Sequence, residues 1–200
     1  MDLEEKSLKI GEVLQASTDS FTAQCYELHN PPPLGSLVKA REGEVEVYGV
    51  VGRATTQGVD PGRRPLALGE EEAEEEDIYR HHPQLAKLFC TSFEALVVGH
   101  RERESLHHYL PPRPARVHSF VYLCLPGEVR GFTSSLDFLH LLVQAQLPGL
   151  GDEVIAACLR WASRTQEDSQ AFLTGAGKEM AQLFGAEPNR LRGILRRIAP

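Results

Sequence analysis

Hydrophobic and polar residues alternate along the first quarter of the chain with the two-residue period of β-strands. The apolar positions in this region are Ile10, Val13, Leu14, Phe21, Ala23, Cys25, Leu28, Leu37, Val38, Val45, Val47, Val50 and Val51. Turn-forming runs separate them at 17–20, 30–35 and 42–44. Short strands joined by short turns are typical of an antiparallel meander, so residues 8–56 are predicted to form a compact barrel or sandwich.

The alternation stops between Thr55 and Asp77, where glycine, proline and acidic residues dominate. This stretch is predicted to be a long loop, because it is too polar and too often interrupted for regular structure. A short helix is expected over 78–89. Two further strands are expected over 93–100 and 118–125.

The period changes after Gly131, where apolar residues recur every three or four positions, as on the buried side of a helix. The expected helix starts are a Ser134/Asp137 capping box, an Asp152 cap, a Thr165/Asp168 cap and Pro188. The turn at 148–149 is expected to end the first of these helices. Short joints between the helices favour antiparallel packing.

Together these patterns predict an α+β fold with two domains. The first domain, residues 1–130, is a small closed antiparallel β-barrel of about six strands, with an acidic loop and a short helix inserted at about 56–90. The second domain, residues 131–200, is a bundle of about four short helices.

Composition adds expectations about location and redox state. Hydrophobic residues make up 42% of the chain, yet no run reaches the roughly 18 apolar residues that a membrane helix requires. The charged start, residues 1–9, is unlike a signal peptide, so a cytoplasmic location is expected. The predicted buried and reduced thiols are those of Cys25, Cys90, Cys124 and Cys158, which are far apart among apolar neighbours.

The net charge of −7 originates in one segment. Residues 70–77 hold seven acidic side chains, so the rest of the chain is neutral overall. A run of like charges repels itself and stays solvated, which favours a mobile acidic loop. The alternative is a docking site for a basic partner.

Three short motifs in the strand region resemble the HAS-barrel, a domain named for HerA helicases and ATP synthases. The motifs are Ile10-Gly11-Glu12-Val13, Gly35-Ser36-Leu37-Val38 and Val47-Tyr48-Gly49-Val50-Val51. The resemblance is strongest over residues 8–56 and extends to about residue 125. It implies a barrel that associates side by side or docks partners, while nucleotide chemistry belongs to a following ATPase domain, for which this sequence has no counterpart.

The glycines of these motifs have a physical interpretation that does not depend on the family. Gly11 and Gly49 fall inside strands, where glycine is typical of a bulge or of a tight bend that a β-carbon would obstruct. Gly11, Gly35 and Gly49 are therefore predicted to be structural residues of the barrel. None of them is expected to bind a ligand.

No local motif for catalysis, metal binding or cofactor binding is found in the sequence. Residues 172–179 resemble a phosphate-binding loop, but Phe172 replaces a required glycine and Glu179 replaces the magnesium-binding hydroxyl. The pairs His81-His82 and His107-His108 lack the spacing of helical metal ligands and are predicted to be surface residues. The chain is expected to be non-enzymatic and without a cofactor, and a site assembled from distant residues is the alternative.

Four arginines, Arg190, Arg192, Arg196 and Arg197, lie on the expected C-terminal helix. They form either a solvated face, which the amphipathic pattern favours, or a set of contacts to nucleic-acid phosphates. The favoured function is that of a non-catalytic assembly or adaptor protein, whose barrel associates with a protein partner or with itself. The alternative is a nucleic-acid-associated protein, in a HerA-like context, that uses these arginines.

Overall fold

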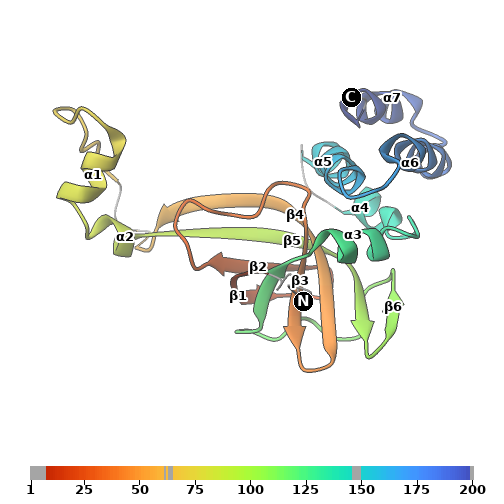
Figure 1. Ribbon diagram of the computed structural model, residues 1–200, viewed down its shortest axis with the longest axis horizontal. Helices are drawn as coiled ribbons and strands as arrows, with labels where there is room; N and C mark the ends of the chain where they lie inside the picture. Colours follow the sequence, from red (N-terminus) through yellow and green to blue (C-terminus); the bar gives the residue numbers. More distant parts are fainter. Residues whose placement is uncertain (1–7, 61, 63–64, 146–149, 199–200) are drawn as a thin grey trace, which may run out of the picture.

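The computed structural model describes residues 8–60, 62, 65–145 and 150–198, and it contains a β-barrel, a layer of helices and a projecting two-stranded ribbon (Figure 1). The strands are β1 (Lys9–Ala16), β2 (Ser20–Cys25), β3 (Leu37–Glu42), β4 (Val45–Gly58), β5 (Phe89–Glu102), β6 (Ser105–His107) and β7 (Phe120–Leu123). The helices are α1 (Glu75–His81), α2 (Leu85–Leu88), α3 (Pro126–Phe132), α4 (Leu139–Gln144), α5 (Gly151–Ser163), α6 (Ser169–Leu183) and α7 (Pro188–Ile198).

Six of the strands close into an antiparallel barrel. Their order is β2-β1-β7-β3-β4-β5, and β5 pairs back to β2 to complete the circle. The short strand β6 pairs only with the far end of β5. Closure gives each of the six strands a neighbour on both sides over part of its length, which removes the free edges of an open sheet. The closed barrel followed by helices, predicted from the sequence, is confirmed.

The barrel interior is filled by side chains from alternate strand positions and by Ala115 from the loop before β7. These residues are Val13, Phe21, Ala23, Cys25, Val38, Ala40, Val47, Val51, Phe93, Ala95, Val97, Ala115 and Val121. Most are small or β-branched, which suits the narrow interior of a six-stranded barrel. Phe21 and Phe93 supply the largest volumes.

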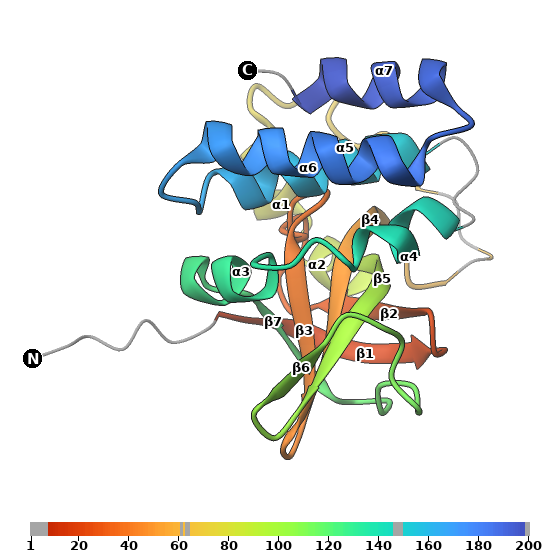
Figure 2. The same cartoon turned by 90° about the vertical axis from the view of Figure 1, so that its right-hand side faces the viewer.

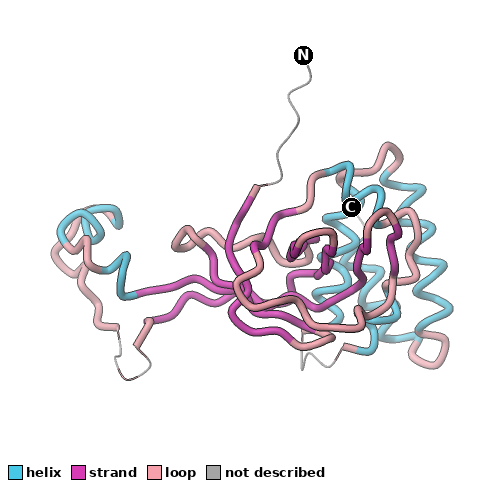
Figure 3. Tube along the Cα trace, turned by 90° about the horizontal axis from the view of Figure 1, so that it is seen from below, coloured by secondary structure: helices cyan, strands magenta, loops and turns pink. Residues whose placement is uncertain are grey.

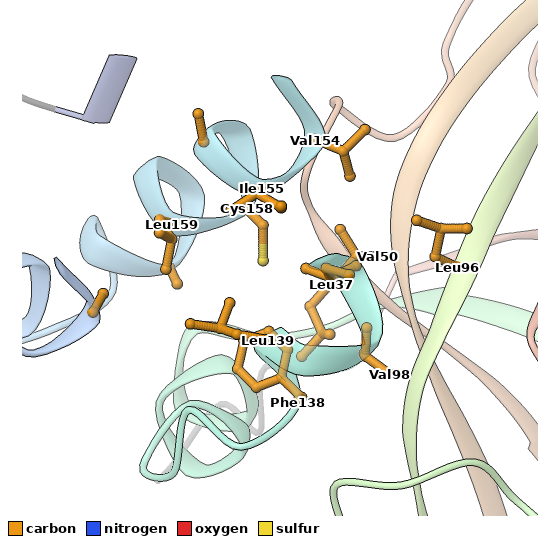
Figure 4. Packing of buried hydrophobic residues seen from close by; sticks show 14 of the residues in the cluster. Leu37, Val50, Leu96, Val98, Phe138, Leu139, Val154, Ile155, Cys158 and Leu159 are labelled. Carbon is orange, nitrogen blue, oxygen red and sulfur yellow. The ribbon is translucent and has the colours of Figure 1, made fainter. Parts of the chain in front are cut away.

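The outer face of the wall formed by β3, β4 and β5 is buried as well, beneath the helices (Figure 4). In the second cluster, Leu37, Val50 and Val98 from the wall pack with helix residues such as Leu139 and Ile155. The barrel and the helices therefore share one hydrophobic core. Residue 130, the expected boundary, lies within α3.

Helix α5 lies between the barrel and α7 (Figure 2). Residues 154–159 are buried on every side of the helix, because neighbours cover more than one of its faces. Helix α7 contributes Ile194 and Ile198 to the shared cluster. Its apolar face is thus already occupied within the molecule.

Two of the predicted structural glycines relieve crowding inside the sheet. A Cβ added to Gly11 would lie 2.1 Å from the carbonyl oxygen of Gln24 on the paired strand. One added to Gly49 would lie 2.9 Å from both Phe21 Cε1 and Ala95 Cβ inside the barrel. The strand register shifts beside both glycines, at the places where bulges were expected.

Gly35 stands at the closest approach between the barrel and α5. It precedes β3 with a φ of +79°, and its N–H donates to the carbonyl oxygen of Val51 at 2.8 Å. An added Cβ would lie 2.3 Å from the carbonyl carbon of Ala157 and 2.4 Å from the backbone nitrogen of Cys158. A side chain is excluded here both by the left-handed backbone and by the helix backbone that faces it.

The segment between β4 and β5 differs from its predicted structure. β4 continues through Thr55 to Gly58, where a loop was expected, because its ladder with β5 persists that far.

The single helix expected over 78–89 is wrong, because two separate helices are found there. Pro83 has no N–H to continue it, so α1 ends at His81 and α2 is a separate short turn of helix. The acidic run is not one loop either, since its last three residues form the first turn of α1, where negative charge is favourable.

Two predicted helix starts are wrong. The Ser134 hydroxyl donates to the carbonyl oxygen of Gly131, and the Asp137 N–H donates to Ser135 Oγ, so the expected capping box is not formed. Helix α4 begins only at Leu139. Asp152 lies within the first turn of α5 instead of capping it.

Other helix boundaries agree with the sequence pattern. Asp168 caps α6 by accepting from the Ala171 N–H at 2.8 Å, and α7 begins at Pro188. Thr165, expected to share the cap, instead donates its hydroxyl to the Ala162 carbonyl oxygen. The turn expected at 148–149 lies outside the described residues. The pattern did not predict β6 or α3, whose start at Pro126 suits the restricted backbone of proline.

A half-buried ion cluster joins α3 to the barrel wall. Lys39 Nζ lies 2.7 Å from Glu46 Oε1 and 2.5 Å from Glu128 Oε1, and the Tyr48 hydroxyl donates to Glu46 Oε2 at 2.8 Å. Burial alone would lower the pKa of Lys39, but the hydrogen bonds to both carboxylates outweigh it and raise that pKa. Burial alone would raise the pKa of Glu46, but hydrogen bonds from Lys39 and Tyr48 outweigh it and lower that pKa.

Substituting Gly35→Ala is expected to lower the free energy of unfolding by about 3 kcal/mol, through left-handed strain and displacement of α5. Gly43→Ala is the matched control, because Gly43 also has a positive φ of 60° but an added Cβ there meets nothing within 4 Å. The control should lose only about 1 kcal/mol. Urea denaturation of both variants measures the difference, and equal losses would refute the role assigned to the contact with α5.

Substituting Lys39→Met is expected to lower the free energy of unfolding by about 3 kcal/mol at pH 7, because two partly buried carboxylates lose their cation. The lowered pKa of Glu46 stabilises the fold above its usual value of 4.5, and this contribution is lost as pH falls through the lowered value. The raised pKa of Lys39 also stabilises the fold. This contribution is fully present below pH 10.5 and is lost as pH rises through the raised value. Urea unfolding at pH 7 and pH 3 should show a smaller loss in acid, and an equal loss at both would contradict this account.

Candidate protein-binding surface

A two-stranded ribbon projects from the barrel and carries a small lobe at its tip (Figures 1 and 3). The ribbon consists of the end of β4 and the start of β5, which stay paired as far as Gly58 and Phe89. β5 pairs with β2 from Ser92 to Leu96, so the ribbon leaves the barrel on the N-terminal side of Ser92. The lobe, defined as residues 59–88, contains α1 and α2 and lies at the opposite end of the molecule from the C-terminal helices.

The lobe holds an apolar groove of about 550 Å³. Its lining residues are Gly58, Val59, Asp60, Pro65, Leu66, Leu68, Leu85, Lys87, Leu88 and Phe89. Leu66 is 82% exposed, Val59 is 59% exposed, and Leu68 and Leu88 are each about 40% exposed. None of these side chains belongs to either hydrophobic cluster of the body.

Contacts with the loop between β2 and β3 fix the position of the lobe. His29 Nε2 and the Tyr79 hydroxyl of α1 are hydrogen-bonded at 2.6 Å, and the two rings meet edge to face. The His29 N–H also donates to Thr91 Oγ1 at 2.9 Å, and Thr91 is hydrogen-bonded to Thr56 across the ribbon. The groove is thus presented on a braced support rather than on a free loop.

Seven acidic side chains of the lobe lie within residues 70–77. Glu72 pairs with His81, and Asp77 pairs with Arg80. The exposed glutamates for which the described residues provide no ion-pair partner are Glu70, Glu71, Glu74, Glu75 and Glu76. The lobe therefore combines an apolar groove with five exposed glutamates that have no ion-pair partner among its described residues.

A second exposed surface lies on the outer side of β1 and β7. Lys9 Nζ lies 4.3 Å from the ring centroid of Phe120 and 5.3 Å from that of Tyr26. Both rings are about half exposed, and the Tyr26 hydroxyl donates to Glu12 Oε2 at 3.3 Å. No helix covers this side of the barrel in the described part of the chain (Figure 1).

Two of the four predicted arginines are used to hold α7 on α5. Arg190 Nε lies 2.7 Å from Asp152 Oδ1, and its guanidinium carbon lies 4.8 Å from the ring centroid of Phe184. Arg197 Nε lies 2.5 Å from Glu153 Oε1. These two arginines are therefore neutralised within the molecule.

Arg192 and Arg196 differ from the other two arginines. Both are exposed, and neither makes an ion pair with any residue that the structure describes. Their i, i+4 spacing places them on the same side of α7. The structure does not bring the four arginines together as one basic strip.

The segment that resembles a phosphate-binding loop lies inside α6 and has no strand before it. An added Cβ at Gly177 would approach Leu195 of α7 at 3.5 Å, as expected for a close helix contact. One at Gly175 would meet nothing within 4 Å, so no close contact requires a glycine there. Helical backbone cannot fold around a phosphate, because its N–H groups are already bonded along the helix.

The histidines are dispersed over the described residues, which contain no cluster of three potential metal ligands. His81 is exposed and His82 is half-buried, on and just after α1. His107 stacks near His100 at 4.9 Å between ring centroids, and His108 Nε2 is hydrogen-bonded to the Phe132 carbonyl oxygen at 2.8 Å. The pair at 107–108 is thus half-buried and structural, not a surface pair as predicted.

All four cysteines are free thiols. Three are buried as expected, whereas Cys90, on the ribbon, is only half-buried. Burial raises the pKa of Cys25 to about 11 and that of Cys158 to about 12. Both thiols therefore stay protonated at neutral pH and are weak nucleophiles.

The groove was not predicted from the sequence. Val59, Leu66 and Leu68 stand alone among polar, glycine and proline residues, without any period that would assign them to a strand or helix. Their only signal is that large apolar side chains persist in a segment with no core of its own.

Among the helices that the structure describes, none is long and apolar enough to cross a bilayer.

Replacing Arg190 with alanine is expected to lower the free energy of unfolding by about 1 kcal/mol, because a partly exposed ion pair and a ring contact are lost together. The matched variant Arg192→Ala should change it by less than about 0.5 kcal/mol. Thermal or urea unfolding of the two variants measures both values. Equal effects would show that the contact with Asp152 does not hold α7 in place.

Comparisons with known proteins assign no relative to this chain. No protein-family model matches it, and no curated protein matches it in sequence. The closed barrel is established by its strand pairing, whereas its resemblance to the HAS-barrel stays a prediction based on three short motifs. The roles of surface residues must therefore be inferred from their own chemistry.

Proposed function

We propose that this protein is a non-catalytic adaptor or assembly protein that binds a partner protein through the groove of its projecting lobe. The observation that carries the proposal is the concentration of exposed apolar side chains there. Five of the thirteen large hydrophobic residues exposed in the described chain, Val59, Leu66, Leu68, Tyr79 and Leu88, belong to the lobe. Exposed apolar patches rimmed by polar groups are typical of protein interaction sites.

Physical chemistry gives the groove a reason to be occupied. Burial of apolar surface stabilises an association by roughly 25 cal/mol per Å² before the entropic cost of binding is counted. A braced support reduces that cost, because little ordering is needed on binding. The hydrogen bond between His29 and Tyr79 supplies such bracing.

The barrel resemblance supports the same class of function through a different surface. A HAS-barrel-like domain implies side-by-side association, and the uncovered face of β1 and β7 offers Phe120 and Tyr26 for such a contact. Aromatic side chains of this kind are enriched at protein interfaces. Self-association through this face would make the protein an assembly element in the cytoplasm.

A second candidate function is contact with nucleic acid through Arg192 and Arg196. Their exposure and shared side of α7 favour it, whereas the acidic lobe would repel phosphates. Two phosphate contacts predict a shallow slope of about −2 for the logarithm of affinity against the logarithm of salt concentration. Absence of binding to DNA or RNA at low salt would exclude this candidate.

The adaptor proposal is tested by affinity capture from the source cell with three versions of the purified protein. The double variant Leu66→Ser/Leu68→Ser removes two exposed leucines of the groove and should leave folding intact. Leu14→Ser is the matched control, since Leu14 is 44% exposed on the barrel. Mass spectrometry should identify at least one protein that the wild type and the control retain and the groove variant loses.

Identical captures by all three proteins would contradict the proposal. Circular dichroism and the unfolding midpoint of each variant provide the folding control. A partner lost from the groove variant while both quantities stay unchanged can only have been bound at the groove.

A further inference from the structure

We infer that the lobe groove takes a basic amphipathic segment, a stretch of a partner protein with apolar anchors flanked by lysine and arginine. This inference rests on the proposed function and specifies the chemistry of the partner. The inference has two parts. The apolar anchors of the segment fit the apolar groove, and its positive charges pair with the acidic residues of the lobe.

The apolar part follows from the shape and lining of the groove. About 550 Å³ accommodates several aliphatic side chains, and its walls come from three separate stretches, at 58–60, 65–68 and 85–89. Grooves of this kind commonly receive an amphipathic helix, whose anchors recur at i, i+3 or i+4, and i+7. Asp60 and Lys87 are the charged side chains of the lining, so the groove offers few polar contacts of its own.

The charge part follows from the acidic surroundings. The lobe has eight acidic and four basic residues, so its local charge is strongly negative. Five of its glutamates are exposed without an ion-pair partner among the described residues. Negative charges that repel one another are relieved by a positively charged ligand, which also gains a faster encounter rate.

Other occupants are disfavoured by the same charges. A symmetric contact between two copies through the lobe would place each acidic run opposite itself, and like charges in juxtaposition destabilise an interface. Nucleic acids and anionic lipid surfaces carry negative charge and are repelled as well. A cationic protein segment is the remaining class that satisfies both the groove and its surroundings.

Three fluorescent peptides of about 18 residues serve as probes in anisotropy titrations. The first has leucine at helical anchor spacing and lysine elsewhere, the second has the same leucines with glutamate, and the third has the same lysines with serine in place of leucine. The first peptide should bind at least tenfold more tightly than either of the others. Its affinity should fall as salt is raised, because the charges are solvent-exposed.

Protein variants separate the two parts of the inference. The triple variant Glu70→Gln, Glu71→Gln, Glu74→Gln should weaken binding of the first peptide about tenfold at low salt. The triple variant Glu104→Gln, Glu167→Gln, Glu179→Gln removes the same charge elsewhere and should leave the affinity within twofold. Leu66→Ser/Leu68→Ser should weaken binding about tenfold at every salt concentration.

Several outcomes would overturn the inference. Equal binding of the lysine and glutamate peptides, or equal effects of the two charge variants, would remove its charge part while leaving the adaptor proposal in place. Failure of the first peptide to bind at all, or its indifference to the groove variant, would remove the site. A dimer in sedimentation that Leu66→Ser/Leu68→Ser dissociates would show that a second copy is the occupant.

Discussion

The wall of β3, β4 and β5 is buried on both faces, and the remaining architecture depends on that constraint. One face lines the barrel and the other supports the helices, so the four consecutive residues 37–40 are all buried. A wall covered on both sides needs a neighbour that approaches closely, and α5 does so at Gly35. The hydrophobic effect holds the helices on the barrel, but the missing side chain sets how closely they pack. Lys39 and Glu128 then fix α3 against the same wall at its polar end.

The projecting ribbon forms because β4 and β5 extend beyond this wall and stay paired with each other. Past Gly52, β4 pairs only with β5 among the described strands, and no described helix covers it. Residues 53–57 are therefore exposed, and they are polar or small. A two-stranded ribbon is only marginally stable by itself. Bracing by the loop around His29 therefore matters to the tip, which lacks a core of its own. Leu66 and Leu68 of this lobe belong to neither hydrophobic cluster of the body.

The extent to which the sequence predicted this structure follows from how local each signal is. Alternation identified the barrel strands, and Asp168 and Pro188 marked helix starts, because these signals act within a few residues. The position of β7 between β1 and β3, the double burial of the wall and the pairing of Arg190 with Asp152 depend on residues far apart in sequence. Periodicity contains no information about them. The groove was missed for the same reason, since three unconnected stretches form it and none has a regular pattern.

Stability and recognition are carried by different residues in this molecule. The two hydrophobic clusters contain the barrel interior, the wall and the helices, but no residue of the groove. Regions with few buried apolar contacts open at lower free energy than the core, so the lobe can adjust without unfolding the barrel. Conversely, the lobe lies far from β3 and α3, which carry Lys39 and Glu128 of the ion cluster, so surface charge on the lobe can change with little effect on the fold (Figure 1). The exposed apolar side chains of the lobe belong to neither cluster, and this separation supports the proposed contact with a partner.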